Sequence, residues 1–150
     1  MHVTLAHIGS RGSARDVLDD LTRTYLTRCT PYALCEAQAF RDEAGLWEWL
    51  GRKQGRTQAV AVLLDSRGTA MSSEAFAAWM GKRRDEGTQH IVLAVGPADG
   101  WSPESRKQAA LLLSLGPMTL AHGLARVVIA EQLYQAFTIL AGHPYHTGHK

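Results

Sequence analysis

Three histidines near the C-terminus, His143, His146 and His149, have the spacing and chemistry of a potential functional group. Imidazole is the commonest metal-ligating side chain, and it also titrates near neutral pH. Pro144 and Gly148 interrupt helical geometry here, and no cysteine or carboxylate cluster lies nearby. A proton-handling group or a flexible tail is therefore favoured over a metal site, and we expect no bound metal.

Two glycine-containing segments follow strongly apolar runs: Asp65-Ser-Arg-Gly68 and Gly96-Pro-Ala-Asp-Gly100. Open α/β sheets bind ligands in the loops that follow parallel strands, and glycine allows a ligand to approach the backbone closely. The same residues are also ordinary turn formers, and spacing alone does not separate these interpretations. Trp101, directly after the second segment, is the tryptophan that most merits a test.

Several common catalytic motifs are absent from the sequence. It contains no Gly-x-x-x-x-Gly-Lys-Ser/Thr loop, and the segment Gly9-Ser-Arg-Gly12 does not match Gly-x-Gly-x-x-Gly. The nucleophile motif Gly-x-Ser-x-Gly is also missing. These absences argue against a nucleotide triphosphatase, a standard dinucleotide oxidoreductase and a serine hydrolase. Cys29 and Cys35 are too few for a disulfide framework and are expected to be buried or partly buried thiols.

Composition indicates a single globular domain over residues 1–150, with 45% hydrophobic and 20% charged residues. The net charge of +2 permits contact with phosphate without predicting it. Basic clusters at 52–56 and 82–84 are expected to be solvated helix ends rather than RNA contacts. The N-terminus resembles no signal peptide and no apolar run is long enough to span a bilayer, so we expect a soluble, cytoplasmic protein without membrane contact.

The pattern of apolar residues predicts five alternations of strand and helix. Strands are expected at 2–8, 32–40 (weaker), 58–65 and 90–95, with a brief last strand at 118–120. The runs at 58–65 and 90–95 barely alternate, which is typical of strands covered on both faces. The alternation predicts an α/β domain with a mostly parallel sheet and helices on both faces.

Capping residues place the helices between these strands. Ser13 is the expected cap of a helix with Val17, Leu18, Leu21 and Tyr25 as its apolar positions. Further helices are expected over 42–52, after Ser72 or Ser73, and from Ser102-Pro103. The helix over 124–140 is apolar over so wide an arc that we expect a homodimer to cover it. Its apolar residues include Leu124, Val127, Val128, Leu133, Phe137 and Leu140.

Five blocks of sequence, in unbroken order over nearly the whole chain, resemble the motifs of one family. They are Leu63-Leu-Asp-Ser-Arg-Gly68 with Met71-Ser-Ser-Glu-Ala-Phe-Ala77, Val95-Gly-Pro-Ala-Asp-Gly-Trp-Ser102, Ser114-Leu-Gly-Pro-Met-Thr-Leu-Ala-His-Gly-Leu-Ala-Arg126, Glu131-Gln-Leu-Tyr-Gln-Ala-Phe137 and Gly142-His-Pro-Tyr-His146. The family is that of the 23S ribosomal RNA (pseudouridine-N3) methyltransferases, small members of the SPOUT class.

This resemblance implies a C-terminal trefoil knot, a homodimer, and S-adenosyl-L-methionine as methyl donor. It also implies methylation of N3 of a pseudouridine in 23S ribosomal RNA, with the RNA or the ribosome as partner. Substrate-binding positions map to His122 and Arg126, and catalytic positions to Tyr145 and His146. The donor-binding positions that it implies are Leu64, Asp65, Gly96, Pro97, Gly100, Gly116, Pro117, Met118, Thr119, Leu120 and Ala121.

The chain departs from the family pattern at four positions. Pro97 replaces a glycine, Ala121 a proline, Gln135 an arginine, and Thr147 a basic residue. Loss of two cations weakens phosphate contact, and Pro97 removes a backbone donor. An alternative function is therefore a divergent knotted dimer that binds the donor, or a related nucleoside, without methylating that site. A pure RNA-binding protein is a third reading, which the charge of +2 and the lack of an aromatic platform disfavour.

Overall fold

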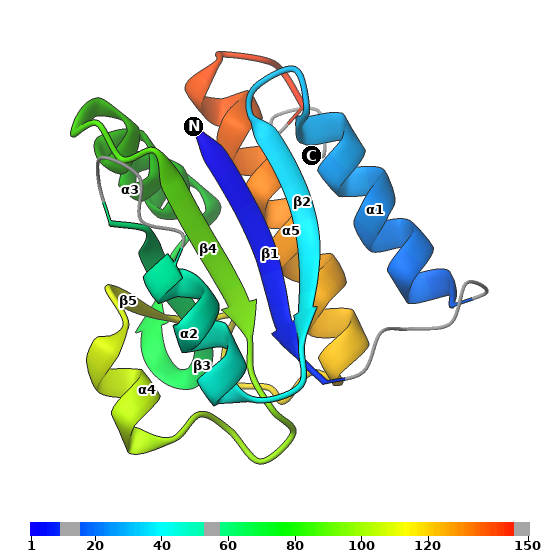
Figure 1. The fold of residues 1–150 in the computed structure, drawn as a ribbon. Helices are drawn as coiled ribbons and strands as arrows, with labels where there is room; N and C mark the ends of the chain where they lie inside the picture. Colours follow the sequence, from blue (N-terminus) through cyan, green and yellow to red (C-terminus); the bar gives the residue numbers. More distant parts are fainter. Residues whose placement is uncertain (10–15, 53–57, 146–150) are drawn as a thin grey trace.

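A five-stranded sheet, parallel at every pairing, forms the centre of the protein in the computed structural model, which describes residues 1–9, 16–52 and 58–145. The strand order is β2-β1-β4-β3-β5 (Figure 1). The strands are β1 (His2–Ile8), β2 (Leu34–Phe40), β3 (Val60–Ala70), β4 (His90–Val95) and β5 (Leu111–Ser114). The predicted parallel sheet is confirmed.

Helices cover both faces of this sheet, as the alternating pattern predicted. Those on one face are α1 (Val17–Cys29), α3 (Ser73–Asp85) and α5 (His122–Leu140), and those on the other are α2 (Glu43–Arg52) and α4 (Pro103–Gln108) (Figure 1). The helix α5 packs against both α1 and α3. Much of its wide apolar arc is therefore covered within the chain: Leu133 and Phe137 are buried, whereas Leu124 is exposed.

The two central strands explain why their sequences barely alternate. On β1, Val3 and Leu5 belong to the core beneath α1, α3 and α5, while Ala6 and Ile8 face the core beneath α2. All residues of β4 are buried. Both faces of each strand are thus removed from water, which favours apolar residues at consecutive positions. No helix among the described residues is long and apolar enough to cross a membrane.

Two of the predicted element ends were wrong. The cap of α1 is Asp16, whose carboxylate accepts a hydrogen bond from the Leu18 amide at 2.9 Å, while Ser13 lies outside the described residues. Val17, expected to face inward, is 76% exposed because it stands at the helix start. The second strand begins at Leu34 rather than 32, because a turn closed on the Cys29 carbonyl comes first.

The last strand was misplaced: it is β5, whereas 118–120 is a loop. The cause lies in β3, which continues through the predicted turn at 66–68 with an irregularity that lets Leu64 and Thr69 both pair with Leu113. Gly68 is required at this crossing, since a Cβ there would lie 2.4 Å from the Leu112 carbonyl oxygen. The predicted caps Ser72 of α3 and Ser102 of α4 are confirmed.

Candidate active site

A cavity of about 590 Å³ opens beyond the carboxyl ends of β4 and β5 and beside residues 64–67 of β3. The loops that follow β4 and β5, over 96–101 and 115–121, surround it together with this part of β3, and the first turns of α5 close one side. A volume of this size is typical of sites for small molecules and cofactors. Its position agrees with the rule that open α/β sheets bind ligands beyond the carboxyl ends of their strands.

The cavity brings together nearly all positions that the sequence assigned to a donor. Of that set, Pro117 alone is missing from the lining residues in the described part of the chain, and His122 also lines the cavity. The other sequence-predicted positions do not gather there. Arg126 and Tyr145 are absent from the lining, and His146 lies outside the described residues.

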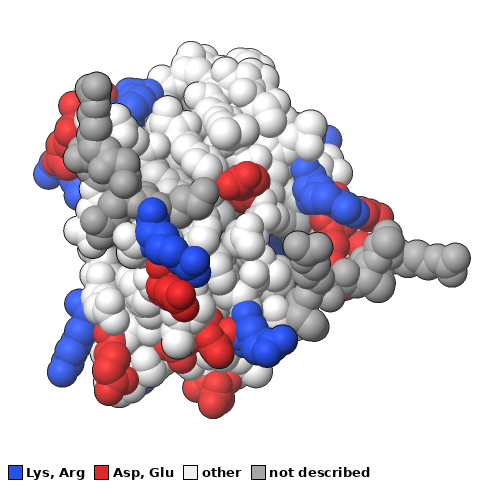
Figure 2. Space-filling view, in the orientation of Figure 1, with Lys and Arg blue, Asp and Glu red and all other residues white. Residues whose placement is uncertain are grey.

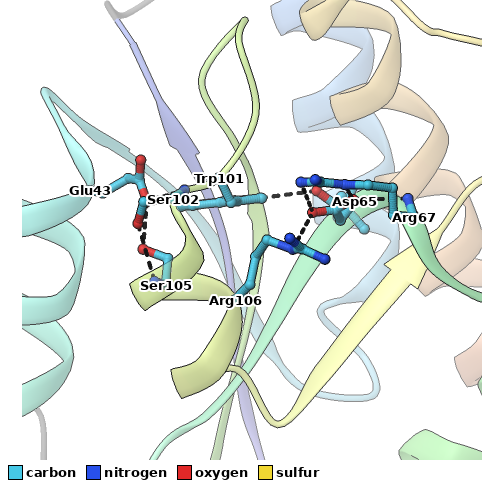
Figure 3. A network of polar contacts seen from close by, with 8 residues as sticks. Glu43, Asp65, Arg67, Trp101, Ser102, Ser105 and Arg106 are labelled. Atoms are coloured by element: carbon cyan, nitrogen blue, oxygen red, sulfur yellow. Dashed lines mark hydrogen bonds and ion pairs between the residues drawn. The ribbon is translucent and has the colours of Figure 1, made fainter.

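Trp101 forms part of the cavity wall and is held firmly, with only 5% of its surface exposed. Its indole Nε1 donates a hydrogen bond to the Leu64 carbonyl at 2.9 Å (Figure 3). The ring also lies against Gly96, where a Cβ would come within 2.6 Å of Nε1. One indole therefore links Leu64, within β3, to the start of the loop after β4. Gly96 is needed because no side chain fits beside that ring.

Asp65 carries a buried carboxylate in the cavity wall, with its side chain 5% exposed. Arg67 and Arg106 pair with it at 3.2 and 3.3 Å, and the Arg67 amide donates to it at 2.8 Å (Figure 3). Burial alone would raise the pKa of Asp65, but the hydrogen bonds from Arg67 and the charges of both arginines outweigh it and lower the pKa. The carboxylate is therefore ionised and already neutralised by protein cations.

A second carboxylate, Glu43 at the start of α2, ties the cavity loop to that helix. Its Oε1 accepts hydrogen bonds from the Ser102 amide at 3.1 Å, the Ser102 hydroxyl at 2.9 Å and the Ser105 hydroxyl (Figure 3). Burial opposes ionisation, yet the bonds from Ser105 and Ser102 lower the pKa of Glu43. The sequence reasoning missed Glu43 and Arg106. Both contacts join residues far apart in the chain, and no local spacing signals them.

His122 begins α5 and presents a neutral imidazole at the cavity wall. Burial, reinforced by the charge of Arg126, lowers the pKa of His122 against the opposing effect of a bond with the Ile8 backbone. Within the described residues, its Nε2 is buried and has no hydrogen-bond partner. An unpaired buried nitrogen costs free energy, and the residue that carries it borders the cavity.

Arg126 instead faces α1, where a nitrogen of its guanidinium lies 2.9 Å from an Asp19 carboxylate oxygen. Both side chains are largely buried, at 12% and 17% exposure. Such an ion pair joins the N-terminal parts of α1 and α5. In this arrangement, the positive charge of Arg126 is committed to the fold rather than presented to the cavity.

Tyr145 lies beside the middle of α5. Its hydroxyl is 3.4 Å from a Glu131 carboxylate oxygen, and its ring meets Tyr134 edge-on with centroids 4.6 Å apart. Burial, followed by the charge of Glu131, raises the pKa of Tyr145 to about 12. Glu131 and Tyr134 lie in the middle of α5, and Tyr145 is absent from the residues that line the cavity. The chain therefore does not bring Tyr145 to its own cavity.

No group of three or more histidine, cysteine or acidic residues that could hold a metal occurs in the part of the chain that the structure describes. On the face seen in Figure 1, acidic and basic side chains are interspersed around a broad uncharged area (Figure 2). This distribution fits the small net charge.

Comparison with known proteins identifies the family. Residues 1–146 match the family model described as predicted SPOUT methyltransferase. A Ribosomal RNA large subunit methyltransferase H from Koribacter versatilis is 47% identical over 132 residues, covering 88% of this chain and 90% of that protein. One of the same name from Brucella ovis is 54% identical over 88 residues, covering 59% of this chain and 52% of that protein.

A solved structure shares the fold. It is the SpoU methyltransferase AviRb from Streptomyces viridochromogenes, crystallised with the cofactor AdoMet. The TM-score is 0.52 at 13% identity; the match covers 95% of this chain, which spans only 58% of the length of AviRb. At that identity the likeness concerns the fold alone. With a family model that matches nearly its whole length, the chain belongs to the SPOUT methyltransferase family.

Proposed function

We propose that the protein is an S-adenosylmethionine-dependent methyltransferase that acts on ribosomal RNA of the large subunit. The observation that carries this proposal is the cavity, because the loops around it hold nearly all positions that the family resemblance assigned to the donor. The names of the relatives, Ribosomal RNA large subunit methyltransferase H, supply the substrate class. A ribosomal substrate also supports a location in the cytoplasm.

The residues present fit such a donor. Gly96 and Gly116 line the cavity without side chains, and the Ser114 hydroxyl lies 3.1 Å from both the amide nitrogen and the carbonyl oxygen of Gly116. His122 also lines the cavity, and its buried Nε2 has no partner within the described residues. Bound S-adenosylmethionine would supply an activated methyl group. The protein's own task is then to align the donor with the RNA base and exclude water.

We further propose N3 of a pseudouridine in 23S ribosomal RNA as the methylated atom. This nitrogen carries a proton that must leave during transfer, so a base has to stand beside it. His146 is the proposed acceptor, and Tyr145 the proposed wall beside the base. The target base would have to leave its stack to reach them.

The position of Tyr145 favours a homodimer in which the tail of one copy reaches the cavity of the other. Tyr145 packs on Glu131 and Tyr134, and it is not among the residues that line the cavity of its own chain. Several large apolar side chains are exposed where α1, α5 and the cavity mouth meet, which is unusual for a surface left in water. They are Val17, Leu21, Met118, Leu120 and Leu124.

The finer topology is also a proposal: one domain over 1–150 with a trefoil knot in its C-terminal part. In its favour, β5 lies at the sheet edge beyond β3, while α5 packs on α1 and α3. The chain at 115–121 must therefore return across the strand ends. A single cooperative unfolding transition would support one domain, and a backbone trace from a crystal would reveal the knot or its absence.

Two measurements test the proposed function. Calorimetry with S-adenosylmethionine tests donor binding, and mass mapping of 23S ribosomal RNA after incubation with unmethylated ribosomes tests the reaction. We expect a methyl group on one pseudouridine, and none when donor is omitted or when the ribosomes are already methylated. Donor binding without any methylated RNA would support the alternative function, a divergent knotted dimer that binds the donor without methylating this site. The observation behind this alternative is Pro97 in the cavity wall, where the family pattern has a glycine.

Mixed dimers test the tail. A chain that ends at Gly142 should bind donor within a few-fold of the full chain yet transfer no methyl group. His146→Ala should slow transfer about a hundred-fold, as expected for loss of a general base. If the tail acts across the dimer, mixing the truncated chain with an inactive Gly96→Trp chain should restore activity. In such a mixed dimer, the truncated chain provides the intact cavity and the Gly96→Trp chain provides the tail. A truncated protein with full activity would contradict the tail's role.

A further inference from the structure

We propose that Glu43 is a positioning residue for the donor: by holding Ser102 and Ser105, it fixes the loop 96–102 in the shape that binds S-adenosylmethionine. The inference rests on the proposed function and names a residue that does not line the cavity. It concerns donor affinity, not the transfer step.

The contacts of Glu43 converge on one carboxylate oxygen. Oε1 accepts the Ser102 amide, the Ser102 hydroxyl and the Ser105 hydroxyl, and Ser105 in turn accepts a hydrogen bond from the Trp47 indole at 2.8 Å. Hydrogen bonds to an ionised acceptor are about twice as strong as neutral ones. Glu43 and Trp47 of α2 thus hold the start of α4, and Figure 3 shows Glu43 beside the two serines.

The anchored serine is the immediate neighbour of Trp101, which carries the effect to the cavity. Trp101 is fixed from one side by the Leu64 carbonyl and packs on Gly96 without spare room. The loop between Gly96 and Trp101 is closed by a hydrogen bond from the Gly100 amide to the Pro97 carbonyl at 2.9 Å. The loop is therefore held at the indole and at Ser102. Removing the second anchor leaves the loop held at the indole alone.

These contacts also occupy two amides at the start of α4 that could otherwise bind an anion. Two amides at the start of α4 already have protein acceptors: the Ser102 amide bonds to Glu43, and the Ser105 amide to the Ser102 hydroxyl. Glu43 therefore occupies the position that an anion would take at a helix start. The cavity lies on the other side of Trp101, where Asp65 is already paired with arginines.

The test compares Glu43→Ala, Glu43→Gln and a control, Leu26→Ala, which opens the core under α1, far from α2. For each we would measure donor Kd by calorimetry, kcat at saturating donor, Tm, and hydrogen exchange of amides 96–102. Glu43→Ala should weaken donor binding about tenfold or more and speed exchange in the loop, with kcat within about threefold. Glu43→Gln should recover part of both, because its amide oxygen still accepts hydrogen bonds.

Three outcomes would overturn the proposal: unchanged donor binding in Glu43→Ala, a kcat that falls with Kd unchanged, or an equal loss of binding in Leu26→Ala at matched Tm. If Glu43→Ala does not fold, Ser105→Ala removes one of the three contacts and should give a smaller change in the same direction. A full-length wild-type protein that binds no donor would refute the proposed function instead. In that case, hydrogen exchange of the amides in the loop 96–102 would still test whether Glu43 anchors this loop.

Discussion

Replacing Gly96 by alanine is a sharp test of how the cavity wall is built. The added methyl would lie 2.6 Å from Trp101 Nε1 and 2.7 Å from its Cε2, closer than atoms in contact can come. The indole cannot yield easily, because it is 5% exposed and bonded to the Leu64 carbonyl. The substitution should therefore displace Trp101 rather than be absorbed by the cavity.

The expected loss can be estimated from two costs. Overpacking a tightly filled site costs about 1–3 kcal/mol. A buried carbonyl that loses its partner adds about 1–3 kcal/mol. The indole can relieve part of the steric overlap only by breaking its hydrogen bond to the Leu64 carbonyl. The two costs are therefore not both paid in full. We expect a loss of about 2–4 kcal/mol in unfolding free energy, which is a drop of roughly 5–15 °C in Tm.

Denaturant unfolding and donor calorimetry are the assays. Gly51→Ala is the matched control, because a Cβ at that α2 position meets nothing within 4 Å and alanine favours a helix. It should leave stability unchanged or raise it by up to about 1 kcal/mol. Gly96→Ala should also weaken donor binding at least tenfold, with unfolding still cooperative.

A double-mutant cycle shows whether the indole is the cause. Trp101→Phe removes Nε1, the atom nearest to the added methyl. In that background, Gly96→Ala should cost at least 1 kcal/mol less than in the wild type, because contacting residues couple by about that much. An equal cost in both backgrounds would refute the reasoning and place the strain elsewhere in the loop.

Three further predictions concern titratable groups. Alkylation should modify Cys35 before Cys29, as read by mass mapping of the alkylated peptides. The hydrogen bond between the two thiols, together with burial, raises the pKa of Cys29, and the same hydrogen bond lowers the pKa of Cys35. Equal rates of alkylation would contradict this prediction. The lowered pKa of Asp65 means that its stabilising effect is present above the ordinary value of 3.8 and is lost as pH falls through the lower value. The Tm difference between wild type and Asp65→Asn should therefore be constant from pH 7 to 5 and shrink only in stronger acid. For Tyr145, the absorbance titration at about 295 nm, taken as wild type minus Tyr145→Phe, should have its midpoint near 12 rather than 10.

The sequence predicted the parallel sheet and the loop after β4 for a physical reason. Runs such as 90–95 are apolar at consecutive positions because helices cover both faces, and that signal is local. The caps Ser72 and Ser102 were equally local, since each bonds to an amide three residues ahead. Features of this kind need no knowledge of distant contacts.

What the sequence did not predict depends on contacts between distant residues. The turn expected at 66–68 is part of β3, because β5 approaches so closely that Gly68 has to lack a side chain. The weak strand expected at 118–120 instead lines the cavity, and the true strand is β5. Glu43 bonds to residues about sixty positions away, as its contacts with Ser102 and Ser105 show. No local pattern identifies such partners.

The structure shows the surroundings of two of the departures from the family pattern, Pro97 and Gln135. Pro97 lacks an amide hydrogen, yet the loop needs only its carbonyl, which accepts the bond from Gly100. Gln135, in place of an arginine, still donates its Nε2 to Glu131 at 2.7 Å, and Glu131 also faces the Tyr145 hydroxyl. Neither replacement breaks the frame around the cavity or the tail. Their effect is therefore expected in contacts with donor and RNA, where a neutral amide attracts phosphate less than a guanidinium does.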